Sequence, residues 1–98
     1  MVLYSREQVL SWYVYLVRCA DGTLYCGTSV DAYRRVREHN TSPRGAKYTR
    51  TRRPVVLVYE AWCKDRSTAC KREAEIKKMT KADKERLVTC GTSADKKN

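Results

Sequence analysis

Glu73 is the residue whose position in this sequence most clearly indicates chemistry. With about 100° of rotation per helical residue, Glu73 falls on the same side of a predicted helix as Ala69 and Ile76, with Met79 beside them, whereas Glu75 lies away from this apolar stripe. Burying an unpaired carboxylate is costly, so Glu73 requires a compensating partner. Two partners remain open: a bound Mg²⁺, or an arginine of the chain in a structural ion pair.

A second candidate pair lies in an earlier predicted helix. Arg35 and His39 are four residues apart, which places them on one helix face within reach of the same phosphate. Arginine offers a fork of donors that matches phosphate oxygens, and histidine can accept or give a proton near neutral pH. The alternative is a solvated helix face, since Arg34 and Arg37 show that arginine is common in this segment.

Tyrosine is used in a way that also indicates polar chemistry. It occurs seven times, whereas phenylalanine is absent, so phenolic hydroxyls stand where a simple core would accept phenylalanine equally well. Some of these hydroxyls are expected to have polar functions. The alternative for any one of them is a strand aromatic with its hydroxyl at the surface.

Residues 41–54 are predicted to form a basic loop, because they are rich in Ser, Pro, Gly and cations and have few apolar side chains. This composition suits contact with a phosphate backbone and stacking on a base. A solvated run of charges is the alternative. The candidate nucleic-acid-binding residues are Lys47, Tyr48, Thr49, Arg50, Arg52 and Arg53.

Three strands must position these residues. Aromatic and β-branched residues predict strands at 12–19 and 23–28, and the turn residues Ala20-Asp21-Gly22 join them in a hairpin. The nearly continuous apolar run at 55–62 predicts a strand buried on both faces, which we expect to be the central strand.

Three helices are predicted from capping residues and periodicity. Ser29 is a good N-cap for a helix over residues 30–40, with Asp31 in its first turn. Either Asp65 or Ser67 can cap a helix that runs through Met79. Thr80 and Asp83 resemble a capping box for a third helix over residues 81–88.

The order β-β-α-β-α-α predicts an α+β fold, in which a small three-stranded antiparallel sheet is flanked by helices. The length of 98 residues suits one domain over residues 1–98, with a core at about 12–88. Residues 1–11 are expected to form an irregular lead-in, and residues 93–98 a frayed tail.

Composition indicates a polyanionic partner. Lys and Arg number 21 against 11 Asp and Glu, a net charge of +10 that would attract nucleic acid in a salt-dependent way. A basic surface that only maintains solubility, or that associates with ribosomes, is the alternative. No apolar run is long enough for a membrane span or a secretory signal, so no membrane partner is expected and the protein is expected to be cytoplasmic. Five cysteines without a C-x-x-C pair predict reduced thiols.

Several short blocks together resemble the GIY-YIG endonuclease domain. They are Tyr13-Val14-Tyr15, Tyr25-Cys26-Gly27, then Arg35 and His39, and the distant helical Glu73. The similarity covers residues 12–88 and is greatest to short stand-alone members of the family, which carry stretches similar to residues 21–27, 45–49 and 72–77. Two positions depart from the family pattern: Tyr13 replaces a glycine and Cys26 an isoleucine.

The resemblance implies a role for each matched residue. Glu73 would be the sole protein ligand of Mg²⁺ or Mn²⁺, and Tyr15 and Tyr25 would position or deprotonate the attacking water. Arg35 would hold the scissile phosphate, with His39 assisting. Mg²⁺ keeps several waters, so one carboxylate together with substrate oxygens is a sufficient ligand set. A tyrosine acts as a base only where cationic groups favour the phenolate.

The tyrosine roles depend on the loop of the first hairpin. A two-residue turn would direct Tyr15 and Tyr25 to opposite faces of the sheet, whereas a three-residue loop pairs Val17 with Tyr25 and places both tyrosines on one face. We therefore predict the three-residue loop, with Gly22 in the left-handed conformation.

Three functions remain open. The first is a metal-dependent endonuclease that hydrolyses phosphodiester bonds, in DNA more than RNA, with low intrinsic sequence specificity. The second is a non-catalytic nucleic-acid-binding module of the same fold, such as an accessory to a repair or recombination complex. The third is an interaction protein that binds polyanions through residues 47–53 and needs no convergent site. A protein partner is compatible with all three, although the sequence identifies none.

Overall fold

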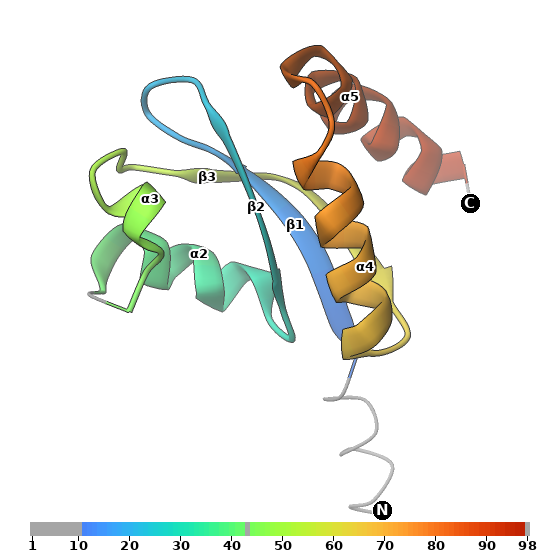
Figure 1. Cartoon of the computed structure of the whole chain (residues 1–98), viewed down its shortest axis with the longest axis horizontal. Coiled ribbons are helices and arrows are strands. Elements are labelled where there is room, and N and C mark those ends of the chain that lie inside the picture. The colour runs from blue at the N-terminus through green and yellow to red at the C-terminus, as the bar shows by residue number, and fades with distance from the viewer. Residues whose placement is uncertain (1–10, 43, 98) are drawn as a thin grey trace, which may run out of the picture.

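The computed structural model describes residues 11–42 and 44–97, with side chains described through residue 90. Residues 1–10 of the predicted lead-in therefore lie outside the described residues. Asn98, the last residue of the predicted tail, also lies outside them. In chain order the elements are β1 (Trp12–Arg18), β2 (Leu24–Ser29), α2 (Ala32–Thr41), α3 (Lys47–Arg50), β3 (Val56–Cys63), α4 (Arg66–Lys77) and α5 (Lys81–Lys97) (Figure 1).

The three strands form an antiparallel sheet in the order β2-β1-β3, which confirms the predicted α+β architecture. β1 is the central strand, so the prediction that the third strand is central was wrong. The burial pattern gives the reason: four consecutive residues of β1, from Val14 to Val17, are buried, because both faces of this strand are covered. β3 is only partly covered, and Val56 and Trp62 remain exposed.

Helices pack on both faces of the sheet. α2 and α3 lie on one side, and α4 and α5 lie on the other (Figure 1). The face toward α4 and α5 contributes Val14 and Leu16, which pack with Ala69 and Ile76 of α4. The opposite face contributes Tyr15 and packs against Ala32 of α2. None of the described helices is both long enough and apolar enough to cross a membrane.

The first hairpin has the predicted three-residue loop. Cys19 N–H donates to Thr23 O at 2.8 Å, and Gly22 N–H donates to Cys19 O at 2.9 Å. Gly22 has a φ of 88°, a left-handed conformation that favours glycine. In the resulting register Val17 lies opposite Tyr25, as predicted.

Tyr15 and Tyr25 therefore share one face of the sheet. Tyr15 lies opposite Gly27, and Tyr25 is two residues from Gly27 along β2, so the alternation of side chains directs both tyrosines to the face covered by α2. The tip of this hairpin is tied to α5, because Arg18 forms two hydrogen bonds with the Glu85 carboxylate at 2.6 and 2.7 Å.

The helix caps agree only partly with expectation. Asp31, not Ser29, is the N-cap of α2, since its carboxylate accepts the Arg34 N–H at 3.0 Å, and α2 begins at Ala32. Asp65 caps α4 by accepting the Thr68 N–H, as one predicted alternative stated.

The last two helices depart from their predicted extents. The Thr80 hydroxyl accepts the Asp83 N–H at 3.1 Å at the start of α5, as the predicted capping box requires. α5 then continues to Lys97, beyond the predicted end at Val88. Within the predicted basic loop, α3 forms a single helical turn, because the Thr49 and Arg50 N–H groups both donate to the Ala46 carbonyl oxygen.

Leucine-to-alanine substitutions in β1 and β3 test which strand is central and which lies at an edge of the sheet. Leu16 in β1 is fully buried, whereas Leu57 in β3 is only partly buried. We expect Leu16→Ala to lower the free energy of unfolding by about 2–5 kcal/mol, because it leaves a cavity beneath α4. Leu57→Ala should cost clearly less. Urea unfolding monitored by tryptophan fluorescence measures both, and equal losses would contradict a central β1.

Candidate active site

The candidate site is built around the hydroxyl group of Tyr15. Tyr15 is 1% exposed, and its Oη lies 2.9 Å from Nε2 of His39 on α2. Gly27, opposite Tyr15 on β2, makes this position possible, because a Cβ there would lie 2.5 Å from the Tyr15 oxygen. The glycine of the Tyr25-Cys26-Gly27 block is therefore required for close packing, a role that sequence spacing did not reveal.

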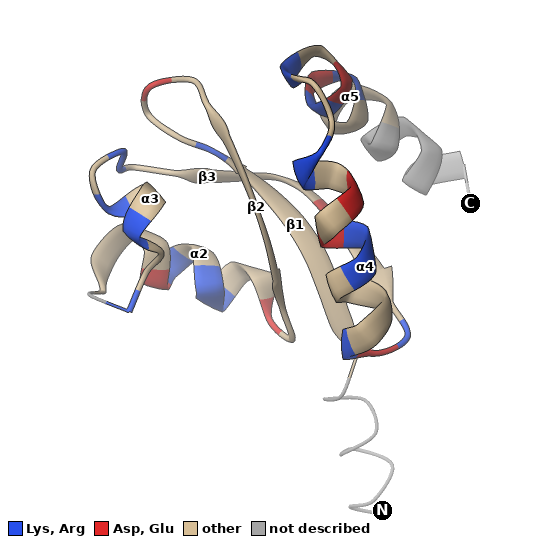
Figure 2. Cartoon of the chain, in the orientation of Figure 1, with Lys and Arg blue, Asp and Glu red and all other residues tan. Residues whose placement is uncertain are grey.

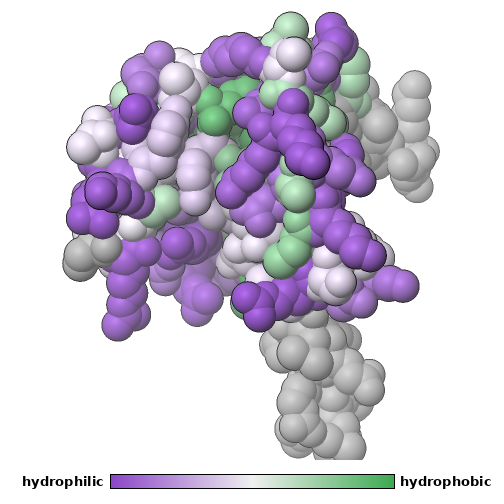
Figure 3. Space-filling view, viewed as in Figure 1, coloured by the Kyte–Doolittle hydropathy of each residue, from purple (hydrophilic) through white to green (hydrophobic). Residues whose placement is uncertain are grey.

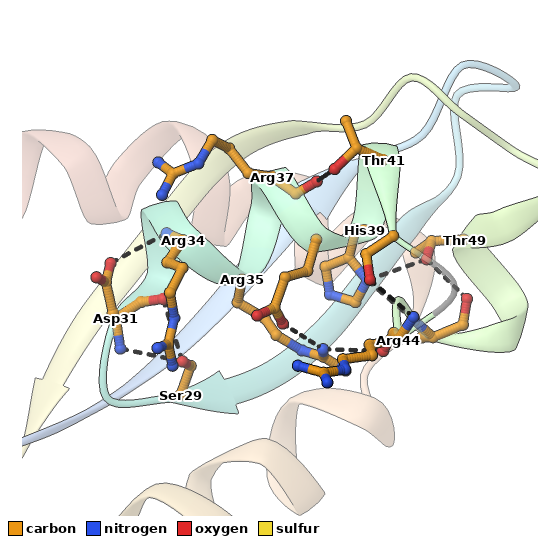
Figure 4. Close-up of polar contacts among 12 residues, drawn as sticks. Ser29, Asp31, Arg34, Arg35, Arg37, His39, Thr41, Arg44 and Thr49 are labelled. Atoms are coloured by element: carbon orange, nitrogen blue, oxygen red, sulfur yellow. Dashed lines mark hydrogen bonds and ion pairs between the residues drawn. The ribbon is translucent and has the colours of Figure 1, made fainter.

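The contacts of His39 define which of its nitrogens carries the proton. The Ala46 N–H donates to Nδ1 at 3.2 Å, so Nδ1 is an acceptor. The Thr49 hydroxyl lies 3.0 Å from the same nitrogen and 2.9 Å from the Ala46 carbonyl oxygen, both of which can accept its hydrogen. The proton of neutral His39 is thus on Nε2, which donates to Tyr15 Oη. Figure 4 shows the contact between His39 and Thr49.

The burial of His39 corrects one expectation from its spacing. His39 is fully buried, so it does not present a surface to a phosphate as the helix-face argument assumed. Burial, assisted by the nearby Arg35 charge, lowers the pKa of His39 to about 4. His39 is therefore neutral at physiological pH and acts on the site through Tyr15.

Arg35 lies at the edge of this buried group. Its Nη1 donates to Glu38 Oε1 at 2.8 Å and to the Arg44 carbonyl oxygen at 3.0 Å, and its side chain remains 29% exposed (Figure 4). Burial raises the pKa of the Tyr15 hydroxyl far above its ordinary value, and the Arg35 guanidinium opposes part of that rise. Arg35 thus combines nearness to Tyr15 with partial access from solvent.

Tyr25 joins the group through its ring. Its centroid lies 5.5 Å from that of His39 in an edge-to-face arrangement and 5.7 Å from that of Tyr48, with which it stacks. Unlike Tyr15, Tyr25 is only partly buried. Of the two predicted catalytic tyrosines, Tyr25 is therefore the one with more access to solvent.

Glu73 approaches from the opposite layer. It lies on α4, its side chain is 22% exposed, and its Oε2 forms an ion pair with Nζ of Lys77 at 3.1 Å. Burial raises the pKa of the Cys26 thiol to about 12, and the Glu73 charge adds to the rise, so Glu73 lies close to β2. The cation that partners Glu73 is a lysine, not the expected arginine; the spacing of four residues was a signal that sequence reasoning did not use.

The donor set around Glu73 is compatible with a hydrated divalent cation. Among the residues whose side chains are described, 11–42 and 44–90, no group of three or more His, Cys, Asp or Glu residues is placed to hold a metal ion. Glu73 would therefore be the single protein ligand, which suits Mg²⁺ because this ion keeps most of its waters. The Lys77 ammonium already occupies a cation position on the carboxylate.

The predicted nucleic-acid-binding residues divide into structural and exposed ones. Thr49, which was predicted to contact nucleic acid, is fully buried against His39, so in this structure its side chain has a structural position. Arg53 donates to the His39 and Ser42 carbonyl oxygens at 2.5 and 2.7 Å, and so binds the C-terminal end of α2. Lys47 and Arg50 are exposed.

Tyr48 and Arg52 form a stack over Tyr25. The Arg52 guanidinium lies 3.9 Å from the Tyr48 ring centroid and is also ion-paired with Asp21 at 3.1 Å. Arg52 and Tyr25 therefore both pack against the Tyr48 ring, although Tyr48 remains 38% exposed.

Cations flank the edge strand β2, which itself carries no charged residue. Lys and Arg lie on α2 and α3 on one side of β2 and on α4 on the other (Figure 2). The space-filling view in the same orientation shows strongly hydrophilic side chains on both sides, with a paler band between them (Figure 3). From the α4 side, Lys77 interacts electrostatically with Tyr25 of β2.

Comparisons with known proteins agree with the sequence resemblance. The sequence profile of the GIY-YIG catalytic domain matches residues 11–86. A UPF0213 protein of Desulfotalea psychrophila is 55% identical over 78 residues, which cover 80% of this chain and 71% of that protein. A UPF0213 protein of Staphylococcus aureus is 50% identical, with coverage of 80% and 94%. The solution NMR structure of a protein from E. faecalis is 42% identical, covers 84% of this chain and 86% of that chain, and has a TM-score of 0.57.

His39 makes the stability of the fold sensitive to acid. The pKa of a histidine is ordinarily 6.5, the value expected in the unfolded chain, whereas the pKa of His39 in the folded protein is about 4. Between pH 6.5 and pH 4 the unfolded chain therefore binds a proton that the folded protein does not. The stabilisation is complete above about pH 6.5 and is lost as the pH falls toward 4, by up to about 3 kcal/mol. Urea unfolding between about pH 7 and about pH 4.5 measures the slope.

The imidazole provides an independent readout, because His39 is the only histidine of the chain. Its NMR resonances should stay constant down to about pH 5 and shift only below it. The pKa of Glu85 is lowered from 4.5 to about 2, chiefly by its hydrogen bond with Arg18, so its stabilisation is lost mainly below about pH 4.5 and affects the unfolding data only at the acid end of this range. A histidine that titrates near its ordinary pKa would contradict the buried contact.

Gly27→Ala should displace Tyr15. The added methyl group would lie 2.5 Å from Tyr15 Oη and 2.7 Å from its Cζ, closer than real contacts allow. We expect a loss of about 1–3 kcal/mol in the free energy of unfolding and a rise of the His39 pKa, since the ring would no longer shield the imidazole. Unfolding and NMR titration measure these effects, and an unchanged histidine pKa would show that Gly27 does not control the Tyr15 position.

Proposed function

The chain belongs to the GIY-YIG family, and from this premise we propose that it is a metal-dependent endonuclease that hydrolyses phosphodiester bonds in nucleic acid. DNA is the expected substrate more than RNA, with low intrinsic sequence specificity. The observation that carries the proposal is the meeting of Tyr15, Tyr25, Arg35 and His39 in one group at the edge of β2, with Glu73 close to the same strand.

The two tyrosines are suited to different tasks. Tyr15 is buried, its pKa is raised, and its oxygen accepts a hydrogen bond from His39, so its own O–H is left to donate. We assign to Tyr15 the positioning of a water or phosphate oxygen. Tyr25 is partly exposed, so a water can reach its hydroxyl, and it is the better candidate to take the proton of the attacking water.

Arg35 and Glu73 would act on the phosphate from opposite sides of β2. Arg35 is 29% exposed, and its guanidinium can exchange the Glu38 carboxylate for phosphate oxygens. Glu73 would hold Mg²⁺ or Mn²⁺. When bound, such an ion stabilises the negative charge that develops on the phosphate and the leaving oxygen.

Exposed cations on both flanks would hold the nucleic-acid backbone. Arg44, Lys47 and Arg50 are exposed near α3, and Lys77 is 54% exposed on α4. Contacts of this kind bind phosphates without reading bases, which is the basis for expecting low specificity and a strong dependence on salt.

A non-catalytic nucleic-acid-binding module is the second candidate. The observation that favours it is the closed state of the site: Tyr15 is 1% exposed, and the Glu73 carboxylate is already paired with Lys77. Salt-sensitive binding without metal-dependent cleavage would identify this function.

A cleavage assay with a matched pair of variants distinguishes the two. Glu73→Gln removes the proposed metal ligand, whereas Glu75→Gln removes a carboxylate of the same helix that is 64% exposed and pairs with Arg72. With Mg²⁺ or Mn²⁺, we expect wild type and Glu75→Gln to cut, and Glu73→Gln to lose activity by a factor of about 10² or more while binding is retained.

The substrates should be labelled single-stranded, duplex and branched DNA and RNA, each also tested with EDTA. Equal cleavage by Glu73→Gln and wild type would remove Glu73 from the mechanism. Binding without cleavage of every substrate by wild type would replace the endonuclease with the non-catalytic module.

A further inference from the structure

The ion pair between Glu73 and Lys77 lies where the proposed metal would bind. Nζ of Lys77 is 3.1 Å from Oε2 of Glu73, one helical turn away on α4. Opposite charges at this spacing stabilise a helix only modestly, and an exposed pair of this kind is easily exchanged for another partner. The two side chains differ in access: Glu73 is 22% exposed, whereas Lys77 is 54% exposed.

Lys77 is the cation assigned to Glu73 within the described part of the chain. The neighbouring carboxylate of α4, Glu75, is paired separately with Arg72 at 2.9 Å. The two pairs therefore do not share a cation. Replacing Lys77 leaves the Arg72 pair intact and removes the ion-pair partner of Glu73.

Lys77 also reaches the edge of β2. Its ammonium interacts electrostatically with Tyr25 and with Cys26, whose side chains point to opposite faces of the sheet. Because β2 is an edge strand, a charge on the neighbouring helix α4 can act on side chains of both of its faces.

We propose that Lys77 is a built-in competitor for the divalent cation: its ammonium neutralises Glu73 in the metal-free protein and must be displaced before the ion binds. This inference rests on the proposed function, in which Glu73 is the metal ligand. If Lys77 competes in this way, the affinity of the site for the metal ion depends on Lys77 as well as on Glu73. The greater exposure of Lys77 allows its side chain to move into solvent while Glu73 stays in place.

Binding of Mn²⁺, without any nucleic acid, tests the competition. The loss of the free-ion EPR signal gives the dissociation constant for wild type and for Lys77→Met, Lys77→Arg, Lys78→Met and Glu73→Gln. Lys78 is the control for the loss of one positive charge at the end of α4; it forms no ion pair with another described residue. Circular dichroism establishes that each variant is folded.

We expect Lys77→Met to bind Mn²⁺ roughly two- to fivefold more tightly than wild type, as the strength of an exposed ion pair implies. Lys77→Arg keeps the competing cation and should remain close to wild type. Lys78→Met should change affinity clearly less than Lys77→Met.

The remaining outcomes separate the two proposals. If Mn²⁺ binding depends on Glu73 but Lys77→Met leaves the affinity unchanged, or changes it no more than Lys78→Met does, the competition is overturned and the proposed metal ligand stands. If neither wild type nor Lys77→Met binds Mn²⁺ in a manner that Glu73→Gln abolishes, Glu73 is not a metal ligand, and both proposals fail.

Discussion

The hydrogen bond between Tyr15 and His39 joins the two parts of the molecule on which the site depends, the central strand and α2. Both side chains are buried, so neither polar group can exchange the other for water. The bond requires Gly27 beneath the tyrosine oxygen and Ala46 and Thr49 behind the imidazole. Hence α3 is part of the site although it is only four residues long: it orients the histidine that orients the tyrosine.

Sheet topology explains how residues from opposite layers can act together. Tyr15 and Tyr25 face α2, whereas Glu73 lies on α4, across the sheet. A central strand would separate these layers completely, but β2 is an edge strand, and Lys77 at its edge interacts with side chains on both of its faces. The proposed site therefore depends on the edge position of β2, whereas β1 is central and its side chains are buried on both sides.

Sequence patterns predicted what depends on local geometry. The three-residue loop with Gly22 at positive φ followed from the requirement that Tyr15 and Tyr25 share one face of the sheet, and the partial burial of Glu73 followed from helical periodicity. Sequence patterns failed where the answer depends on which other element packs against a strand or helix. An apolar run over 55–62 does not indicate whether a strand will be central or at an edge, and the spacing of Arg35 and His39 defines a shared face but not what covers it.

The same distinction applies to charge. The net charge of +10 indicates a polyanion, but several of the cations that create it are committed within the fold. Arg18 binds Glu85, Arg52 stacks on Tyr48, and Arg53 binds carbonyl oxygens at the end of α2. Some cations of the basic segment 41–54 therefore stabilise the fold. Its composition alone could not show which of them are free to bind nucleic acid. The cations left exposed flank β2 from both layers, so a polyanion that contacts both flanks would cross this edge strand.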